Sequence, residues 1–188
     1  HVEIVRLLLS KSDIDMNKAG DDGSTALTIA SQGGHVEVVR LLLLKIDIDI
    51  NKATNLGATA LMFASEKGHV DVVRLLLSKS DIDINKAQKD GATALFIASE
   101  KDHVEVVRLF LSKSDIDINK AKDTGATALF MASQNNHVEV VKLLLSKSGI
   151  DINKDKKGGF TVLFMASQDG HVEIVRLLLS KSGIDINK

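Results

Sequence analysis

The chain has 188 residues, a formal net charge of −1, 44% hydrophobic residues and 26% charged residues. This composition excludes a disordered chain, and the near-neutral charge argues against a general nucleic-acid or anionic-membrane surface. The chain contains no cysteine, which excludes disulfides, thiolate metal sites and a cysteine nucleophile.

The same features bear on where the protein works. The absence of cysteine fits a reducing compartment, so we expect an intracellular, cytoplasmic protein. No uninterrupted apolar run reaches membrane-spanning length, so we expect no direct membrane insertion. Because the first residue is His1 rather than Met, we expect the chain to be a fragment of a longer protein.

A fixed interval of 34 residues organises the sequence. It separates the six histidines, which are His1, His35, His69, His103, His137 and His171. It also separates six asparagines, from Asn17 to Asn187, and five glycines, from Gly23 to Gly159. Such a period is typical of a stacked array in which each unit buries its apolar face against its neighbours. We therefore expect one array instead of one or two globular domains.

In chain order, the array begins with half a unit at residues 1–17. Five complete units follow, at residues 18–51, 52–85, 86–119, 120–153 and 154–187. Each complete unit predicts two short helices, which in the third span residues 93–101 and 103–113. Thr93 is the predicted N-cap of the first, because its hydroxyl can accept a hydrogen bond from a first-turn amide. The second is apolar over most of its circumference, which predicts burial on several sides and leaves Glu105 and Arg108 as an exposed pair.

Three positions in each unit carry residue types that tolerate positive φ. The first ends the first helix and holds Gly34, Gly68, Asp102, Asn136 and Gly170. The second follows the second helix and holds Asp13, Asp47, Asp81, Asp115, Gly149 and Gly183. The third is the glycine that runs from Gly23 to Gly159, as a tight turn requires. The alternating SDIDIN segment predicts an extended stretch whose isoleucines point inward.

Helix, tight turn, helix and extended turn with this period resemble the ankyrin repeat. GATALFIAS at 91–99 matches the family's G-x-T-P-L-H-x-A-A pattern, and HVEVVRLFL at 103–111 matches its G-H-x-E-V-V-x-L-L-L pattern. GIDIN at 149–153 matches its G-A-D-V-N pattern. The resemblance covers the whole chain and implies an all-α helix-turn-helix repeat solenoid with short extended turns between repeats.

The sequence departs from the family pattern at three places. The family's proline is replaced by Ala26, Ala60, Ala94, Ala128 and Val162. The first helical turn is then less pre-organised than with proline, but we expect the helix to form. Its first histidine is replaced by Thr28, Met62, Phe96, Phe130 and Phe164, so we expect an apolar ladder in place of hydrogen bonds. One extra residue follows the leucine run, and we expect it to lengthen or bulge the end of the second helix.

The polar residues that recur in every unit are expected to be structural. Stacked units lie about 10 Å apart, too far for two histidines to share one zinc at ~2.1 Å, so we expect each histidine to bond nearby backbone. The serines of the first helices (Ser31, Ser65, Ser99, Ser133 and Ser167) lie in a helix contact without a recurring His-carboxylate pair. Asp115 and Asp117 fit turn roles better than calcium binding, and the KDKK cluster at 154–157 fits a solvated turn. We expect no catalytic residue, metal or cofactor site, and no enzymatic activity.

The units differ mainly at the turn tips and at the ends of the first helices, which the resemblance places on a concave, partner-binding face. The candidate protein-binding residues are Asp21, Asp22, Gln32, Asn55, Leu56, Glu66, Lys67, Lys89, Asp90, Glu100, Lys101, Asp123, Thr124, Gln134, Asn135, Lys157, Phe160, Gln168 and Asp169. The alternative is that these positions vary because exposed residues drift. The position after the turn glycine, Ala58 and Ala92 among its members, is expected on the same face. Phe160 is there either an exposed anchor or a cover over the core of the last unit.

The resemblance implies a protein–protein interaction scaffold that binds a protein or peptide on its concave face, and no nucleic acid. A second hypothesis, favoured by the near identity of the units, is a structural spacer or elastic segment of a longer array. A third is a substrate-recruiting module of a larger multidomain protein. No capping unit with a polar outer face is visible, so we also expect fraying or end-to-end self-association of the chain.

Overall fold

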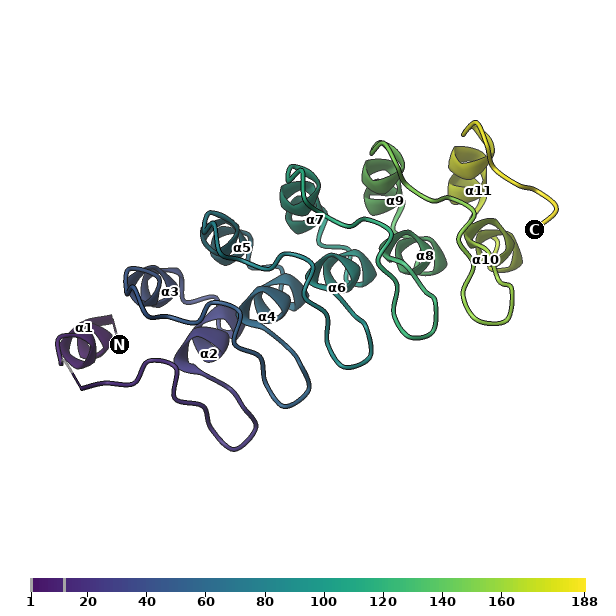
Figure 1. Ribbon diagram of the computed structural model, residues 1–188. Coiled ribbons are helices and arrows are strands. Elements are labelled where there is room, and N and C mark those ends of the chain that lie inside the picture. Colours follow the sequence, from purple (N-terminus) through teal and green to yellow (C-terminus); the bar gives the residue numbers. More distant parts are fainter. Residues whose placement is uncertain (1, 12) are drawn as a thin grey trace.

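The chain folds into helices stacked in two rows, as Figure 1 shows for the computed structural model, which describes residues 2–11 and 13–188. The helices found there are α1 (Val2–Leu9), α2 (Ala26–Gln32), α3 (Val36–Leu42), α4 (Ala60–Glu66), α5 (Val70–Leu77), α6 (Ala94–Glu100), α7 (Val104–Leu111), α8 (Ala128–Gln134), α9 (Val138–Leu145), α10 (Val162–Gln168) and α11 (Val172–Leu179). The odd-numbered helices form one row and the even-numbered helices the other, and a loop projects before each even-numbered helix (Figure 1). This arrangement confirms the predicted all-α repeat solenoid.

The even-numbered helices begin at a threonine N-cap, as predicted. Thr93 has extended backbone angles, and its hydroxyl accepts a hydrogen bond from the amide of Phe96 at 3.2 Å. Thr25, Thr59, Thr127 and Thr161 cap their helices in the same way. Each of these caps satisfies an amide that the first helical turn would otherwise leave unpaired. Within the described residues, no helix of either row is long and apolar enough to cross a membrane.

Left-handed residues end the even-numbered helices, also as predicted. Asp102 and Asn136 have φ of 59° and 60°, and glycine holds the same conformation at the equivalent place in the other units. The prediction of a second left-handed position is wrong for Asp47, Asp81 and Asp115, which have no positive φ. The helix has already ended by then at a residue in right-handed conformation, which is Leu43 before Asp47 and Ser78 before Asp81. Only the glycines at this position, such as Gly149, adopt the left-handed state.

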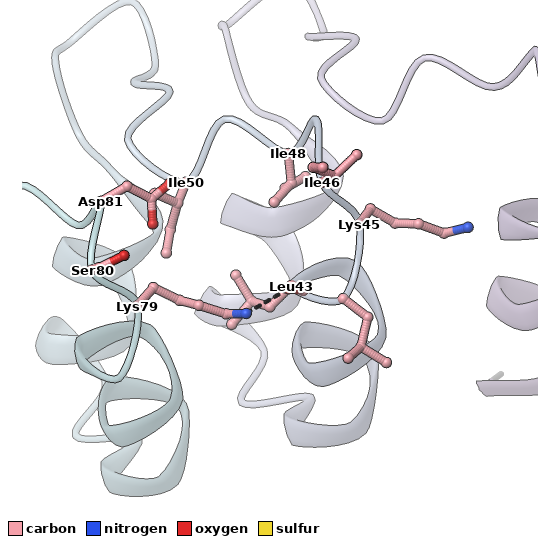
Figure 2. A pocket seen from close by; sticks show the side chains of 9 residues that line it. Leu43, Lys45, Ile46, Ile48, Ile50, Lys79, Ser80 and Asp81 are labelled. Atoms are coloured by element: carbon pink, nitrogen blue, oxygen red, sulfur yellow. Dashed lines mark hydrogen bonds between the residues drawn. The ribbon is translucent and has the colours of Figure 1, made fainter.

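The second helix is shorter than predicted. α7 ends at Leu111, where the sequence predicted a helix to residue 113, because the amide of Lys113 bonds the carbonyl of Phe110, three residues back. This tighter turn closes the helix end. The lysine at this place then reaches the preceding repeat: Lys79 Nζ donates to the carbonyl of Leu43 at 2.7 Å (Figure 2). The extra residue of the repeat therefore does not lengthen the helix.

The core lies between the two rows and between successive repeats. Phe110 of the odd row and Phe130 of the even row are among its largest fully buried side chains. The predicted apolar ladder is buried at Thr28, Met62, Phe96 and Phe130 and exposed only at Phe164, in the last unit. The final isoleucine of the SDIDIN segment points inward where a further repeat follows, as Ile84 and Ile118 show.

Side chains also bond each repeat to the next. His69, His103, His137 and His171 place Nε2 within 2.9 or 3.0 Å of a main-chain carbonyl at the end of the preceding even helix. Because a carbonyl only accepts, Nε2 carries the proton in each case. These bonds confirm the predicted structural role for these four histidines. His35 caps its helix without a side-chain bond to the backbone there, and His1 lies outside the described residues. Asp117 accepts from the amide of Asn119 at 3.1 Å, which confirms its turn role.

Candidate protein-binding surface

The finger loops and the ends of the even-numbered helices form one surface, which we call the finger face. The finger loops comprise residues 20–24, 54–58, 88–92, 122–126 and 156–160, and they project from the even row (Figure 1). Neighbouring loops are joined by main-chain hydrogen bonds, for example from the amide of Lys89 to the carbonyl of Leu56 at 3.1 Å. A tight turn at the glycine of each of the first four loops, such as Gly91 with φ of 85°, brings its backbone against the next loop, where a β-carbon would crowd backbone atoms.

The finger face contains the residues that the sequence selected as candidates. All of them are exposed or half-buried, and the half-buried ones are Glu66, Glu100 and Gln134. A hollow of about 230 Å³ shows that loops and helix ends share one surface. It is lined by Glu66, Gln88, Asp90, Ala92, Phe96, Ile97, Glu100, Lys101 and Lys122. Its volume lies below the usual range for small-molecule sites, roughly 300 to 1,000 Å³.

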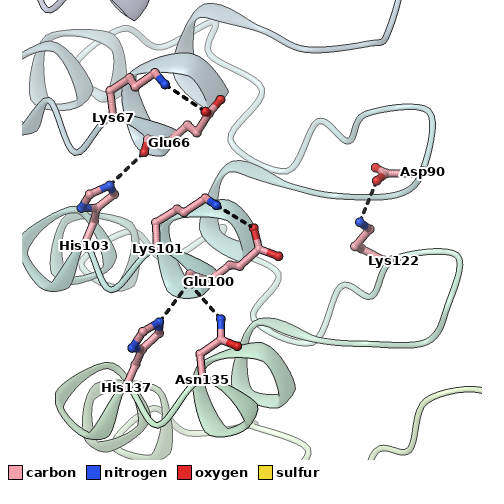
Figure 3. A network of polar contacts seen from close by, with 9 residues as sticks. All are labelled: Glu66, Lys67, Asp90, Glu100, Lys101, His103, Lys122, Asn135 and His137. Atoms are coloured by element: carbon pink, nitrogen blue, oxygen red, sulfur yellow. Dashed lines mark hydrogen bonds and ion pairs between the residues drawn. The ribbon is translucent and has the colours of Figure 1, made fainter.

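Charged groups around this hollow are paired, as Figure 3 shows. Lys67 lies 3.2 Å from Glu66, Lys101 lies 3.8 Å from Glu100, and Lys122 Nζ lies 2.7 Å from Asp90. The hydrogen bond from Lys122 holds the pKa of the Asp90 carboxyl below its ordinary value. The centre of the finger face is therefore polar but nearly balanced in charge.

Lysines from the loops also cover the aromatic ladder. Lys122 Nζ lies 5.3 Å from the ring centroid of Phe96, and Lys156 Nζ lies 5.0 Å from that of Phe130. In each case the lysine comes from the loop of the following repeat. Ammonium groups over an aromatic face are attracted by its quadrupole, so these contacts tie each loop to the helix behind it.

The charge of the finger loops changes along the array. The first loop carries Asp21 and Asp22, and hydrogen bonds from Ser24 lower the pKa of Asp22. The last loop carries Lys156 and Lys157, and the loops between them are mixed or neutral. The finger face therefore has an acidic end and a basic end.

The structure adds detail at the position that follows each turn glycine. Ala58, Ala92 and Ala126, which follow the turn glycines, are buried, although Ala92 lies in the lining of the central hollow. Phe160, at the same position in the last unit, is 38% exposed, and its ring lies 5.3 Å from that of Phe164.

The other candidate chemistries find no support in the geometry. Ser31, Ser65, Ser99 and Ser133 are buried in the helix contact, as predicted, whereas Ser167, in the last unit, is exposed. In the part of the chain that the structure covers, no three metal-ligating side chains form a cluster. Lys154 of the KDKK cluster donates to the carbonyl of Asn119 at 2.9 Å and is engaged within the fold.

The sequence analysis missed two exposed residues away from the finger face. Leu44 and Ile46 stand where the other units have serine, and both are largely exposed. The sequence itself distinguishes these residues, because a comparison of the units shows serine replaced by leucine or isoleucine at the two positions. Sequence reasoning weighed only the positions that the family resemblance associates with binding.

Comparison with known proteins identifies the repeats. A family model described as "Ankyrin repeats (3 copies)" matches residues 1–88, 44–122, 80–156 and 114–188. Among 519 matching chains of known structure is the ankyrin repeat protein EF0377, with a TM-score of 0.89 and 27% sequence identity over 96% of this chain and 92% of that one. No curated protein matches. Ankyrin repeats are generally protein–protein interaction modules, typically without enzymatic activity. The matches along the whole sequence show that this chain belongs to the ankyrin-repeat family.

Proposed function

We propose that this chain is an interaction scaffold that binds a protein or peptide partner on the finger face. The observation that carries the proposal is the separation of two classes of residue. Residues that vary between units gather on this face, whereas those that pack or bond the repeats, such as His103 and Asn85, are repeated from unit to unit. Selection for a partner acts on such exposed, variable positions while the fold keeps the rest.

The finger face offers both anchors and charges for this task. Phe160 and Phe164 form a partly exposed aromatic pair at one end of the face. Paired charges surround the central hollow, where Phe96 and Ile97 belong to the lining but are already buried. Apolar side chains that are covered on binding supply most of an interface's affinity. The change from acidic to basic loops supplies orientation, because a partner with the opposite charge order is steered into one direction.

Substitutions on the two sides of the array test the proposal. A peptide selected for binding from a displayed library serves as the probe, and its affinity is measured by calorimetry. Three substitutions alter exposed side chains of the finger face: Lys89→Glu, Asp123→Lys and Phe160→Ala. Each should weaken binding of the peptide about tenfold without loss of helical content. Glu105→Ala and Arg108→Ala, an exposed pair on α7, are the matched controls. Normal binding by all three finger-face variants would show that the proposed face is wrong.

A second proposal concerns copies of this chain. α1 exposes Ile4, Leu7 and Leu8, and the last repeat exposes Phe164, Val172 and Leu179. Equivalent residues inside the array are buried, as Phe130 and Leu145 are, or half-buried, as Val138 is. We propose that chains of these 188 residues associate end to end, with the last repeat of one copy against α1 of another.

A further inference from the structure

The lysine over the Phe96 ring has a carboxylate partner from the preceding finger loop. Lys122 Nζ lies 5.3 Å from the ring centroid of Phe96 and 2.7 Å from Oδ2 of Asp90. The ion pair spans two neighbouring loops, as Figure 3 shows. The other oxygen of Asp90 accepts a hydrogen bond from the amide of Ala92 at 3.0 Å. One oxygen of Asp90 thus closes its own turn, and the other binds the lysine of the next loop.

The same arrangement recurs one unit later without the carboxylate. Thr124 stands where Asp90 stands in the preceding unit. Its hydroxyl lies 3.5 Å from the amide of Ala126, so it takes the place of Asp90 in the turn. Threonine has one side-chain oxygen and no charge, so it offers no carboxylate to Lys156, the equivalent of Lys122. Among the residues that the structure describes, Lys156 forms no ion pair.

Two aromatic rings hold the ammonium group of Lys156. Its Nζ lies 5.0 Å from the ring centroid of Phe130 and 5.8 Å from that of Phe160, and Lys156 is half-buried. The rings attract the cation but carry no negative charge that would cancel it. An anion that approaches Nζ therefore meets a charge that is already positioned and partly shielded from water, which strengthens their attraction.

The other charged groups of the last finger loop leave this positive charge uncompensated. The neighbouring carboxylate, Asp155, is engaged elsewhere, because its Oδ1 lies 3.0 Å from Lys188 Nζ. Lys157, on the other side, is exposed and adds a second positive charge. The loop thus presents two ammonium groups, one of them held between rings, at the basic end of the finger face.

We propose that Lys156 is a carboxylate-binding subsite of the finger face, which takes an aspartate or glutamate side chain of the partner. The carboxylate lies beside Thr124, where Asp90 places its own one unit earlier. The fold itself shows which group binds a lysine in this setting, and charge-assisted hydrogen bonds of this kind are among the stronger ones in proteins. This inference rests on the proposed function and adds to it the chemical class of one partner residue.

NMR of the full chain provides the test. The side-chain Hε signals of Lys156 and Lys122 are the readout, because the rings beside these lysines should shift them away from those of other lysines. The probe is the synthetic peptide acetyl-Ser-Glu-Asp-Glu-Ser-amide, titrated at low ionic strength. It should shift the Lys156 signals saturably and leave those of Lys122 nearly unchanged. The neutral peptide acetyl-Ser-Gln-Asn-Gln-Ser-amide should bind at least fivefold more weakly.

Two variants exchange the residues of the equivalent positions. Thr124→Asp supplies the carboxylate within the chain, so it should weaken binding of the probe at Lys156 at least tenfold. Asp90→Thr removes the carboxylate from Lys122, so the Lys122 signals should now respond to the probe. Ser146→Asp adds the same charge at an exposed position of the odd-numbered row and is the matched control. It should weaken binding less than twofold.

Four results overturn the proposal. They are unchanged binding of the probe by Thr124→Asp, an equal loss in Ser146→Asp, equal binding of the neutral peptide, and no shift of Lys156 at millimolar probe. Inorganic phosphate is the further arm, and a response of Lys156 to phosphate as strong as to the probe overturns it too, because that identifies a general anion site.

Failure of this subsite can be told apart from failure of the proposed function. If the displayed-library peptide still depends on the finger-face substitutions while the acidic probe ignores Thr124→Asp, only the subsite is wrong. If that peptide ignores the finger-face substitutions, the proposed face is wrong, whatever the acidic probe does.

Discussion

The side-chain oxygen of Asn85 accepts a hydrogen bond from the amide of Asp117, at 2.8 Å, in the next repeat. The same side chain donates from Nδ2 to the carbonyl of Asp115 at 2.7 Å. Asn17, Asn51, Asn119 and Asn153 repeat this pair of bonds one unit apart. One asparagine per unit therefore links each repeat to the next, and the stability of the array depends on such nearest-neighbour contacts.

Loss of one such link should destabilise the array measurably. Asn85→Ala removes two hydrogen bonds between repeats, each worth about 0.5 to 1.5 kcal/mol, so the free energy of unfolding in urea should fall by about 1 to 3 kcal/mol. Asn187 is the matched control, because its side chain makes neither of these bonds among the residues that the structure describes. Asn187→Ala should cost less than about 0.5 kcal/mol, as surface changes usually do. Equal losses for both variants would contradict this role of the asparagine.

The aromatic ladder offers a second comparison within one chain. Phe130 is buried and Phe164, at the equivalent position of the last unit, is 46% exposed. Phe130→Ala should cost about 3 to 5 kcal/mol, because it removes a buried ring and leaves a cavity. Phe164→Ala should cost less than half as much. Urea unfolding followed by circular dichroism measures both, and similar losses would show that burial between repeats is not what the ladder contributes.

The Asp90–Lys122 pair predicts a titration. Its hydrogen bond lowers the pKa of Asp90 in the folded chain, so the stabilisation is present above the unfolded pKa, near 3.9, and is lost as the pH falls through the folded value. The Asp90 side chain is 51% exposed, so the effect should stay below about 1 kcal/mol. Lys122→Met should raise the pKa of Asp90, as read by carboxyl-carbon NMR. An unchanged pKa in this variant would show that the pair does not persist in solution.

End-to-end association should depend on the exposed ends of the array. Sedimentation of this chain should show a mass that rises with concentration, because association covers apolar surface at α1 and α11. Leu179→Glu places a charge on the last helix and should return the chain to monomer. Ser146→Glu, exposed in the middle of the array, is the control and should leave association unchanged. A concentration-independent monomer for the unaltered chain would contradict end-to-end stacking.

Much of the fold follows from the sequence because the same local solution is repeated. The threonine caps, the left-handed Asp102 and the role of His103 each depend on residue types at fixed spacing, which one unit displays in full. The end of α7 and the backbone at Asp115 were predicted incorrectly, because a tight turn closes the helix before a left-handed residue is needed.

The details of the candidate surface were harder to predict. The pairing of Asp90 with Lys122, and the position of Lys122 above Phe96, depend on how far one loop is displaced along the next, which no single unit encodes. The burial of Ala92 depends on the direction in which the turn sends a small side chain. Leu44 and Ile46, in contrast, can be recognised as unusual from a comparison of the units alone.

The central claim is that a partner occupies the finger face, and amide chemical-shift mapping tests it most directly. A displayed-library peptide that binds the chain should be titrated into isotope-labelled protein. The account predicts that the largest shifts fall at residues 88–92 and 122–126 and at the ends of α4 and α6, with little change at Glu105 and Arg108. Shifts confined to the odd-numbered helices, with the finger loops unaffected, would contradict it.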